Sequence, residues 1–560
     1  MGYSEIYCHI CGVSFNIARR RKPGEPDLAS WDYTGKQDDY PGVDEVDIDT
    51  CAQNGCFAAI KYPKEDDDIL KDPDYIPRDE GLYSEPDEYD SEYETVNAMS
   101  VSGEDEANSD SNDDDRDGDE DSEVDFYSDW LAKTLDPQGR FPGEPVGNFG
   151  YSNERCRDDR IFSIQPSILS DGHDPEELEH IPNRACTEAN AYSGFAISLD
   201  EMRGCRTAQC LVHKGAVQDQ SENIIPLDDW EISGNWFLSG LCDGMPSRDC
   251  SSPYVWPAQG GVNQPRAENV NFDPEWTTSE DLAMPFHPWC FDIFCRQSKT
   301  RFNCINIPGL IKWRNSELSY DDFHSFPRSA DVFEGQDQFW HHAPGREYLA
   351  ANPLYVPALP TILLNAAKEK EEWNQKIIEN PKPPKYHRAS SLAVQNDVFA
   401  LMPPEICLLI ISYLNAGDLT NLRIASKVFT KLPNGVWQRL IREEMPWLWE
   451  SHYDDGVHHP SVWTAVTAND LMLLKEERKR YSKRLREDYT STKEVVDYLL
   501  PIPKEMPNQL ILPKESTNWH AVYTQIKKNW SNLKGLKNRK RIWEDVEEIM
   551  ARIEKCEAES

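Results

Sequence analysis

The sequence lacks the segments that would place it in or across a membrane. Its start, from Met1 to Phe15, has no basic stretch followed by an apolar run, so we expect no signal peptide, and Ile6 stands where a myristoylation motif requires Ser or Thr. No window approaches the roughly 20 apolar residues that a membrane-spanning helix needs. We therefore expect no membrane partner and a location in the cytoplasm, the nucleus or both.

Basic side chains are scarce. The chain has 58 Lys and Arg against 99 Asp and Glu, which gives a net charge of -41. Because such a surface repels polyanions, nucleic acid is not expected as a partner of the whole chain. Residues 475–486 and 527–541 are locally basic, and Trp530 lies in the second segment. We interpret both as solvated helix faces; a nucleic-acid or nuclear-import element is the alternative.

Familiar catalytic motifs are missing as well. The sequence contains no P-loop, no Gly-x-Gly-x-x-Gly turn, no Gly-x-Ser-x-Gly elbow and no His-Glu-x-x-His helix. His341 and His342 follow Trp340, and exposed or core histidines explain this pair more simply than catalysis does. Nothing in the sequence nominates an active site, although an unfamiliar one stays an alternative.

What is present is enough material for a large folded protein of mixed class. The 560 residues are 39% hydrophobic and 11% aromatic, but they include 39 Pro and a block of acids. We predict an α+β fold, in which an irregular Cys- and Trp-rich mixed domain with a disordered acidic insert is followed by helices. The expected parts are a zinc-knuckle-like segment at 1–64, the disordered acidic segment at 65–130, the irregular α+β domain at 131–380, an all-α segment at 396–445 and a C-terminal helical region at 446–560.

The all-α segment has more apolar surface than it can bury by itself. Pro403 and Pro404 suit the first turn of a helix, and apolar residues such as Ile406 and Leu409 then occupy both of its faces. Asp418 is expected to cap the next helix. About 45 residues of short helices rarely make a stable core unaided, so a second chain is expected to cover the excess surface.

This segment resembles an F-box. The resemblance rests on Met402-Pro403-Pro404-Glu405-Ile406, Ile411-Ser412-Tyr413-Leu414, Asp418-Leu419 and Ser426-Lys427-Val428-Phe429. It implies docking through residues 398–430 on the Skp adaptor of a ubiquitin ligase. The residues that it assigns to adaptor contact are Phe399, Pro403, Pro404, Ile406, Leu409, Ile410, Leu414 and Leu419.

The F-box resemblance also implies what the whole chain does. It would be a substrate-receptor subunit of a Skp-cullin-F-box ubiquitin ligase, with the Skp adaptor and the cullin scaffold as partners and an unknown protein as substrate. It would be a non-catalytic subunit that raises the concentration of substrate near the transferase. The alternative is a zinc-containing protein- or nucleic-acid-interaction protein outside any ligase, in which the helical segment is merely core.

The wider arrangement is similar to a group of fungal F-box proteins with an N-terminal Cys-x-x-Cys-Gly motif. In that group a His-Pro-x-Cys motif precedes the F-box and a Trp-x-x-Val/Leu-Tyr segment follows it. The corresponding residues here are Cys8 to Gly12, His287 to Cys290 and Trp519 to Tyr523.

Two of these motifs have the spacing of metal ligands. The pair in Cys8-His-Ile-Cys11-Gly12 is typical of a zinc knuckle, and a His and a Cys three residues apart at a helix start complete a treble-clef site. The preferred set is therefore Cys8, Cys11, His287 and Cys290, holding one structural zinc. Other candidates are Cys51 with Cys56, or Cys205 and Cys210 with His213; ordinary buried thiols are the remaining alternative.

Overall fold

The computed structural model describes, with short gaps, residues 6–60, 161–165, 178–216, 229–244, 282–366, 397–467 and 510–559. The described part mixes helices with short strands, as predicted. The segment predicted to be disordered, 65–130, and the basic segment 475–486 lie outside the described residues. None of the described helices has the length and apolarity to span a bilayer.

The strands form three small sheets. In chain order they are β1 Arg19–Arg20, β2 Phe57–Ile60, β3 Ile161–Ser163, β4 Leu178–Ile181, β5 Tyr192–Ser193, β6 Thr207–His213, β7 Trp236–Leu238, β8 Cys242–Asp243 and β9 Met284–Phe286. β1 pairs with β5 in parallel, β2 lies antiparallel between β3 and β4, and β6 pairs antiparallel with β7, β8 and β9. Because the other three strands of its sheet all pair with β6, this strand is the centre, and six of its seven residues are buried.

Helices dominate the second half of the chain. The α-helices are α1 Ile48–Asn54, α3 Asp229–Ser233, α4 Pro288–Phe302, α5 Ile307–Ser316, α6 Tyr320–Ser325, α7 Ala330–Phe333, α9 Pro404–Ser412, α10 Ala416–Ala425, α11 Asn434–Glu444, α13 Trp519–Lys528 and α14 Lys534–Ala558. Short 3-10 turns are η2 Val43–Glu45, η7 Lys214–Ala216, η9 Glu347–Ala350, η10 Val398–Leu401, η11 Lys427–Phe429, η12 Trp449–Ser451, η13 Val462–Thr464 and η15 Trp530–Asn532.

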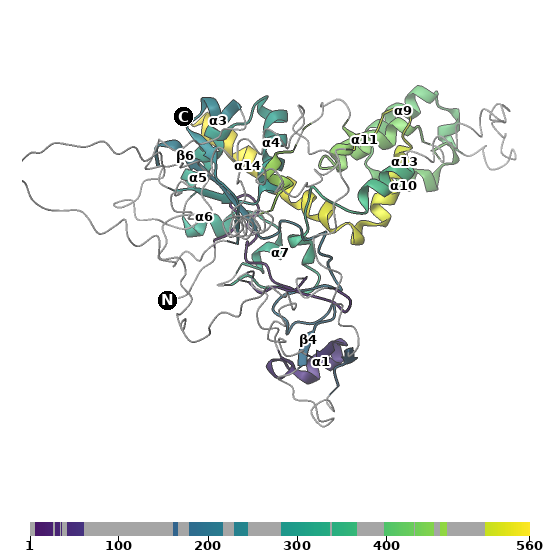
Figure 1. The fold of residues 1–560 in the computed structure, drawn as a ribbon. Coiled ribbons are helices and arrows are strands. Elements are labelled where there is room, and N and C mark those ends of the chain that lie inside the picture. The colour runs from purple at the N-terminus through teal and green to yellow at the C-terminus, as the bar shows by residue number, and fades with distance from the viewer. Residues whose placement is uncertain are drawn as a thin grey trace, which may run out of the picture.

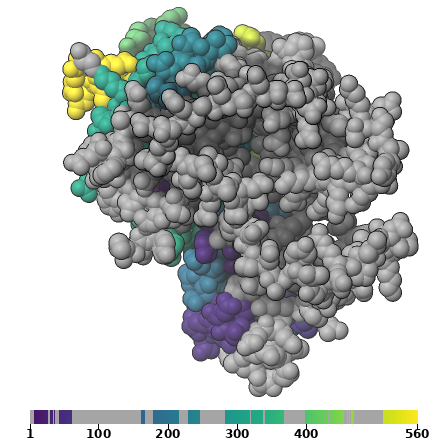
Figure 2. Space-filling model, turned by 60° about the vertical axis from the view of Figure 1, so that its left-hand side comes forward, coloured from purple at the N-terminus to yellow at the C-terminus, as the bar shows by residue number. Residues whose placement is uncertain are grey.

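Three hydrophobic cores lie in different parts of the molecule. The largest joins the knuckle segment near Cys8, the β6 sheet, α4, α5 and α14, so residues from the expected segments 1–64, 131–380 and 446–560 share one core. The second contains α9, α10, α11 and α13. The third is small and lies around α1, β2 and β4, in the lower lobe of Figure 1. In the space-filling view the purple and blue surface of this lobe lies at the lower end of the molecule (Figure 2).

Helix α14 connects the two large cores. Ile542, Val546, Ile549 and Ile553 recur every three or four residues and are fully buried in the first core, whereas Leu536 belongs to the second. At its start, a Cβ on Gly535 would come within 2.4 Å of the Asn352 carbonyl oxygen, so only glycine allows this approach. The yellow helix runs between the two parts in Figure 1.

Candidate metal centre and exposed helical surface

The chain between Cys8 and Gly12 folds into a tight turn with both thiols on its inner side. The Cys8 amide donates to the Val13 carbonyl at 3.0 Å, and the Gly12 amide donates to the Cys8 carbonyl at 2.7 Å. The Cys11 amide lies 3.5 Å from Cys8 Sγ, which is a contact that favours a thiolate. Gly12 has φ of +69°, where other residues are strained, so the glycine of the motif is required by this turn.

His287 and Cys290 stand at the beginning of α4. His287 is the N-cap residue and Cys290 lies in the first turn. His287 Nδ1 is 3.7 Å from Cys11 Sγ and 4.0 Å from Cys290 Sγ. The other ring nitrogen, Nε2, lies 3.2 Å from the Cys205 carbonyl oxygen. Because this carbonyl can only accept, Nε2 carries the proton and Nδ1 presents its lone pair to the sulfurs.

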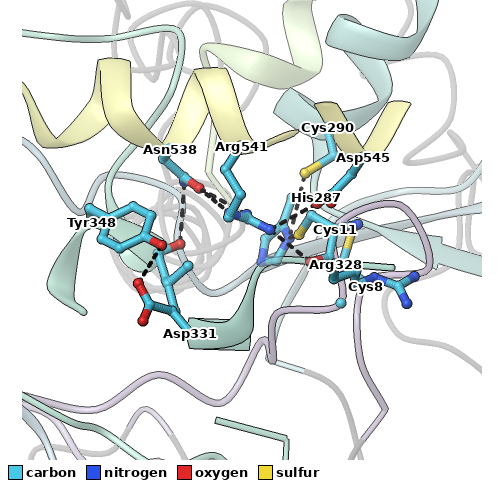
Figure 3. A network of polar contacts seen from close by, with 12 residues as sticks. Cys8, Cys11, His287, Cys290, Arg328, Asp331, Tyr348, Asn538, Arg541 and Asp545 are labelled. Carbon is cyan, nitrogen blue, oxygen red and sulfur yellow. Dashed lines mark hydrogen bonds and ion pairs between the residues drawn. The ribbon is translucent and has the colours of Figure 1, made fainter. Parts of the chain in front are cut away.

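The four predicted ligands therefore meet at one buried point. The donor atoms of Cys8, Cys11, His287 and Cys290 all lie within 4.8 Å of one another (Figure 3). In a tetrahedral site with usual zinc bond lengths, neighbouring donor atoms are separated by about 3.6 to 3.8 Å. The nitrogen-to-sulfur distance to Cys11, 3.7 Å, agrees with this geometry, and the distance to Cys290, 4.0 Å, is slightly longer. Four buried protein donors could hold a metal ion without leaving a position for substrate.

Two arginine side chains donate hydrogen bonds to the backbone of the knuckle. Arg328 and Arg541 donate to the carbonyls of His9 and Cys11, each at 2.9 Å. Arg541 also contacts Asp545 at 3.0 Å. A divalent metal with three thiolates carries one net negative charge, and two arginines with one carboxylate supply one net positive charge. This compensation permits the site to be buried.

The neighbouring donor groups change the pKa of the Cys11 thiol. Burial raises its pKa, but contacts with the Cys290 and Cys8 thiols and with His287 outweigh burial, so that the pKa lies well below its ordinary value. Burial and the neighbouring thiols raise the pKa of Cys8 and of Cys290, so of these three thiols only Cys11 is held as the thiolate that binds metal.

The cysteines that the sequence offered as alternative metal ligands lie in two different parts of the structure. Cys205 and Cys210 are buried in the first core, and the His213 ring packs on Trp236 with centroids 5.0 Å apart. Neither of the two metal-ligand clusters in the described part of the chain includes these residues. Cys51 and Cys56 belong to the second such cluster.

The sequence predicted only two of the four residues in that second cluster. Its other members are His180 and Cys186, and the four donor atoms again lie within 4.8 Å of one another in a buried site. His180 and Cys186 are six residues apart, a spacing that is common by chance, and 129 positions separate Cys51 from His180. Pattern alone therefore gave no reason to combine them.

Helix α9 has one buried and one exposed apolar face. Cys407 and Ile411 are buried in the second core. Ile406 and Leu409 lie on the other side and are 44% and 53% exposed. The apolar surface that the sequence predicts in excess is thus uncovered in the single chain.

Exposed apolar residues are concentrated around this helix. Of the thirteen large hydrophobic side chains that are exposed in the described part of the chain, eight fall between residues 398 and 428, so the surface is a local feature. We call this set the apolar patch: Val398, Leu401, Ile406, Leu408, Leu409, Tyr413, Ile424 and Val428.

The residues assigned to adaptor contact divide into three groups. Pro403 and Pro404 are exposed like Ile406 and Leu409, and the half-buried members are Phe399, Ile410 and Leu414. Leu419 is fully buried, at 0% exposure, because α10 turns it into the second core. Its assignment to a contact surface is corrected. The helix cap also differs: the Asn415 side chain, rather than that of Asp418, accepts the Asp418 amide at 2.9 Å.

Two further expectations can be compared with the structure. His342 is buried and His341 is exposed, so they do not form a joint site. The interpretation of 527–541 as a solvated face is wrong at Arg539 and Arg541, which are buried and paired with Glu450 and Asp545. Charge composition could not reveal this, since the partners come from other segments or one helical turn away.

Comparisons with known proteins give one local similarity. No family model matches the chain, and no solved structure matches it either. The chain is 48% identical over 67 residues to the mitochondrial ATP-dependent RNA helicase mss116 of Aspergillus oryzae. The match spans 12% of this chain and 11% of the helicase. It contradicts the prediction of a non-catalytic subunit, because the shared segment belongs to an enzyme in that relative.

Proposed function

We propose that this protein is an F-box adaptor and that its apolar patch binds the Skp adaptor of a ubiquitin ligase. The observation that carries the proposal is that α9 is apolar on both faces but buries only one of them. Its inner face holds the helical core together through Cys407 and Ile411, and its outer face leaves Ile406 and Leu409 in water. These exposed apolar side chains do not stabilise the fold of the single chain, whose net charge of -41 otherwise gives it a polar surface.

The size of the patch is suitable for a stable contact. Full burial of one Leu or Ile side chain contributes roughly 1.5 to 3 kcal/mol. Ile424 is 82% exposed and Tyr413 is 81% exposed, so burial of these side chains by a partner would still provide most of this free energy. Exposed apolar side chains gathered in one part of a chain are typical of protein interaction sites.

The fold suggests how the patch is linked to the rest of the molecule. The second core carries the patch, and α14 continues from this core into the first. A protein held by the first part of the chain would then stay at a limited distance from the ligase. Such tethering raises its effective concentration near the transferase.

We propose further that Cys8, Cys11, His287 and Cys290 bind one structural zinc. Three sulfurs and one imidazole in tetrahedral reach are the usual ligands of this metal. The ion would attach the knuckle to α4, which the sequence separates by 276 residues. Zinc binding would thereby contribute directly to the free energy of folding.

The adaptor proposal is tested with charged substitutions in the patch. The full chain with Ile406→Glu and Leu409→Glu is co-expressed with the Skp adaptor and purified through a tag on this chain. We expect the adaptor to co-purify with the wild-type chain and to be reduced at least tenfold with the double variant, because two carboxylates would have to be desolvated. Ile232→Glu, at a residue 64% exposed outside the patch, is the matched control and should bind normally.

The test requires that the variant still folds. Both side chains are exposed, so the thermal midpoints of the double variant and of Ile232→Glu should stay close to the wild type. Equal recovery of adaptor by wild-type and double-variant chains, or none with the wild type, would reject the proposal.

The local similarity to an RNA helicase supports a second candidate function, a role that involves RNA. This candidate is tested by measuring ATP hydrolysis with and without RNA, and by measuring RNA binding over a salt series. Phosphate contacts give an affinity that falls steeply with salt. RNA-stimulated hydrolysis, with no adaptor bound, would favour this function over the first.

A further inference from the structure

We propose that Cys51, Cys56, His180 and Cys186 form a second zinc site. It lies in the small lobe around α1 and β4, apart from the apolar patch and from the Cys8 cluster (Figure 1). The inference does not depend on the adaptor function, because it rests only on the ligand geometry and the composition of this lobe.

Cys51 and Cys56, the first two ligands, lie in helix α1 and directly after the turn that ends it. Asp47 caps α1, which holds Cys51, and the helix ends at Gly55 with φ of +70°. The left-handed glycine reverses the chain, and the Cys56 amide then donates to the Cys51 carbonyl at 3.0 Å. The turn is built from this one segment and brings both thiols into the same four-donor cluster, as a structural zinc site requires.

The other two ligands come from a strand and the loop after it. His180 lies in β4, where it is paired with Ala58 of β2 just beyond Cys56. Its Nε2 is 3.4 Å from Cys51 Sγ and 3.8 Å from Cys186 Sγ. These separations bracket the roughly 3.6 Å expected between sulfur and nitrogen donors on one zinc ion.

The composition of the lobe indicates that it needs a cross-link. Its hydrophobic cluster has eight buried members, and three of them are Cys51, Cys56 and Cys186. A core this small does not normally stabilise a separate unit without a metal or a disulfide. One disulfide would leave the third thiol and the histidine unexplained, whereas one tetrahedral ion uses all four donors.

Zinc fits this site better than a catalytic or redox metal does. Three thiolates and an imidazole favour zinc, and all four groups are buried. Four protein donors leave no position for water or substrate, so the ion would be structural. It would fasten α1 and β2 to β4, although 129 positions separate Cys51 from His180.

The first experiment counts metal in the full-length chain. The wild type, purified after expression with zinc, should contain about two zinc ions per chain by elemental mass spectrometry, because two four-donor sites are present. Cys51→Ser with Cys56→Ser should remove about one ion, and Cys8→Ser with Cys11→Ser should remove the other. Cys242→Ser, at a buried cysteine outside both clusters, is the control and should keep both ions.

A second measurement counts the bound thiolates in the wild-type chain and so does not depend on the folding of the Cys51 and Cys56 variant. Cobalt replaces zinc in the wild-type chain, and the intensity of the sulfur-to-cobalt charge-transfer band reports the number of bound thiolates. Six bound thiolates support two sites of three sulfurs each. Three bound thiolates, together with one ion that only the Cys8 pair controls, would overturn the second site and leave the first intact.

Discussion

His342 shows at the scale of one residue how burial decides the charge of a side chain. Its Nε2 accepts a hydrogen bond from the Ala18 amide at 2.9 Å, and its ring packs edge-on against Tyr192. Burial lowers the pKa to about 3, with further lowering from His341, Arg20 and Arg206. This histidine is therefore a neutral part of the core.

The low pKa of His342 predicts a loss of stability in acid. Unfolding would return the pKa to about 6.5, so the unfolded chain binds more protons between pH 6.5 and 3 and is favoured there. The contribution is fully present above pH 6.5 and should decrease by nearly 1.4 kcal/mol per pH unit well below it. The free energy of unfolding, measured by urea titration from pH 7 to 5, gives this slope.

The matched variant for this prediction is His342→Gln, whose side-chain oxygen can accept from Ala18 without titrating. Because both proteins share the same Cys/His clusters, the difference between their pH slopes isolates His342. Identical slopes for the two proteins would contradict the assignment of a neutral, buried histidine.

Single residues also show which ligands a pattern can identify. Cys8, Cys11 and Gly12 form one turn, so their spacing carries the geometry. His287 and Cys290 share the first turn of a helix and are equally local. His180 approaches Cys51 only because β4 pairs with β2, and the sequence contains no signal for that pairing.

At the scale of elements, α14 depends on a buried ion pair. Arg539 donates to Glu450 at 2.9 Å and to the Pro353 carbonyl at 2.7 Å, and its guanidinium lies 3.8 Å from the centre of the Trp449 ring. The side chains of Arg539 and Glu450 are 1% and 8% exposed. The pair connects α14 to the segment that follows α11.

Removing one partner of this pair should be costly. Arg539→Leu leaves the Glu450 carboxylate buried without its cation, and we expect a loss of about 3 to 5 kcal/mol in the free energy of unfolding. Arg301→Leu is the control, because Arg301 and Glu554 form a pair with side chains 38% and 46% exposed. This change should cost less than about 1 kcal/mol.

Urea unfolding measures the free energy of unfolding of both variants. If Arg539→Leu and Arg301→Leu lose the same small amount, Arg539 is not held in the buried pair. Replacement of both Arg539 and Glu450 by Leu should recover part of the stability, since no unpaired charge remains.

At the scale of the whole molecule, the two Cys/His clusters belong to different cores, and zinc bound in them should respond differently to a chelator. This prediction rests on both proposed zinc sites. His287 Nε2 is held by the Cys205 carbonyl, whereas His180 Nδ1 is buried and has no hydrogen-bond partner in the described part of the chain. Support of this kind changes metal affinity by about 10- to 100-fold. The lobe site should therefore lose its zinc first.

Zinc release and tryptophan fluorescence measure this order. Among the described residues, the small core contains no tryptophan, whereas Trp289 and Trp313 belong to the core around the Cys8 cluster. We expect a first release with little change in fluorescence and a second release with a large one. With Cys8→Ser and Cys11→Ser, only the early release should remain. A single release that changes fluorescence at once would contradict the order.

The sequence by itself determined the features that depend on neighbouring residues. The knuckle turn at Cys8, the helix start at His287, the apolar excess around Ile406 and the mixed fold class all follow from local spacing and composition, because a turn or a helix fixes which nearby side chains point the same way.

Only the tertiary structure decided which distant segments meet. It joined the knuckle to α14, buried Arg539 and Leu419, and assembled the cluster around His180 from α1, β2 and β4. The physical reason is that packing and burial depend on the whole chain, so a charged or apolar residue acquires its role from partners that its own neighbourhood does not specify.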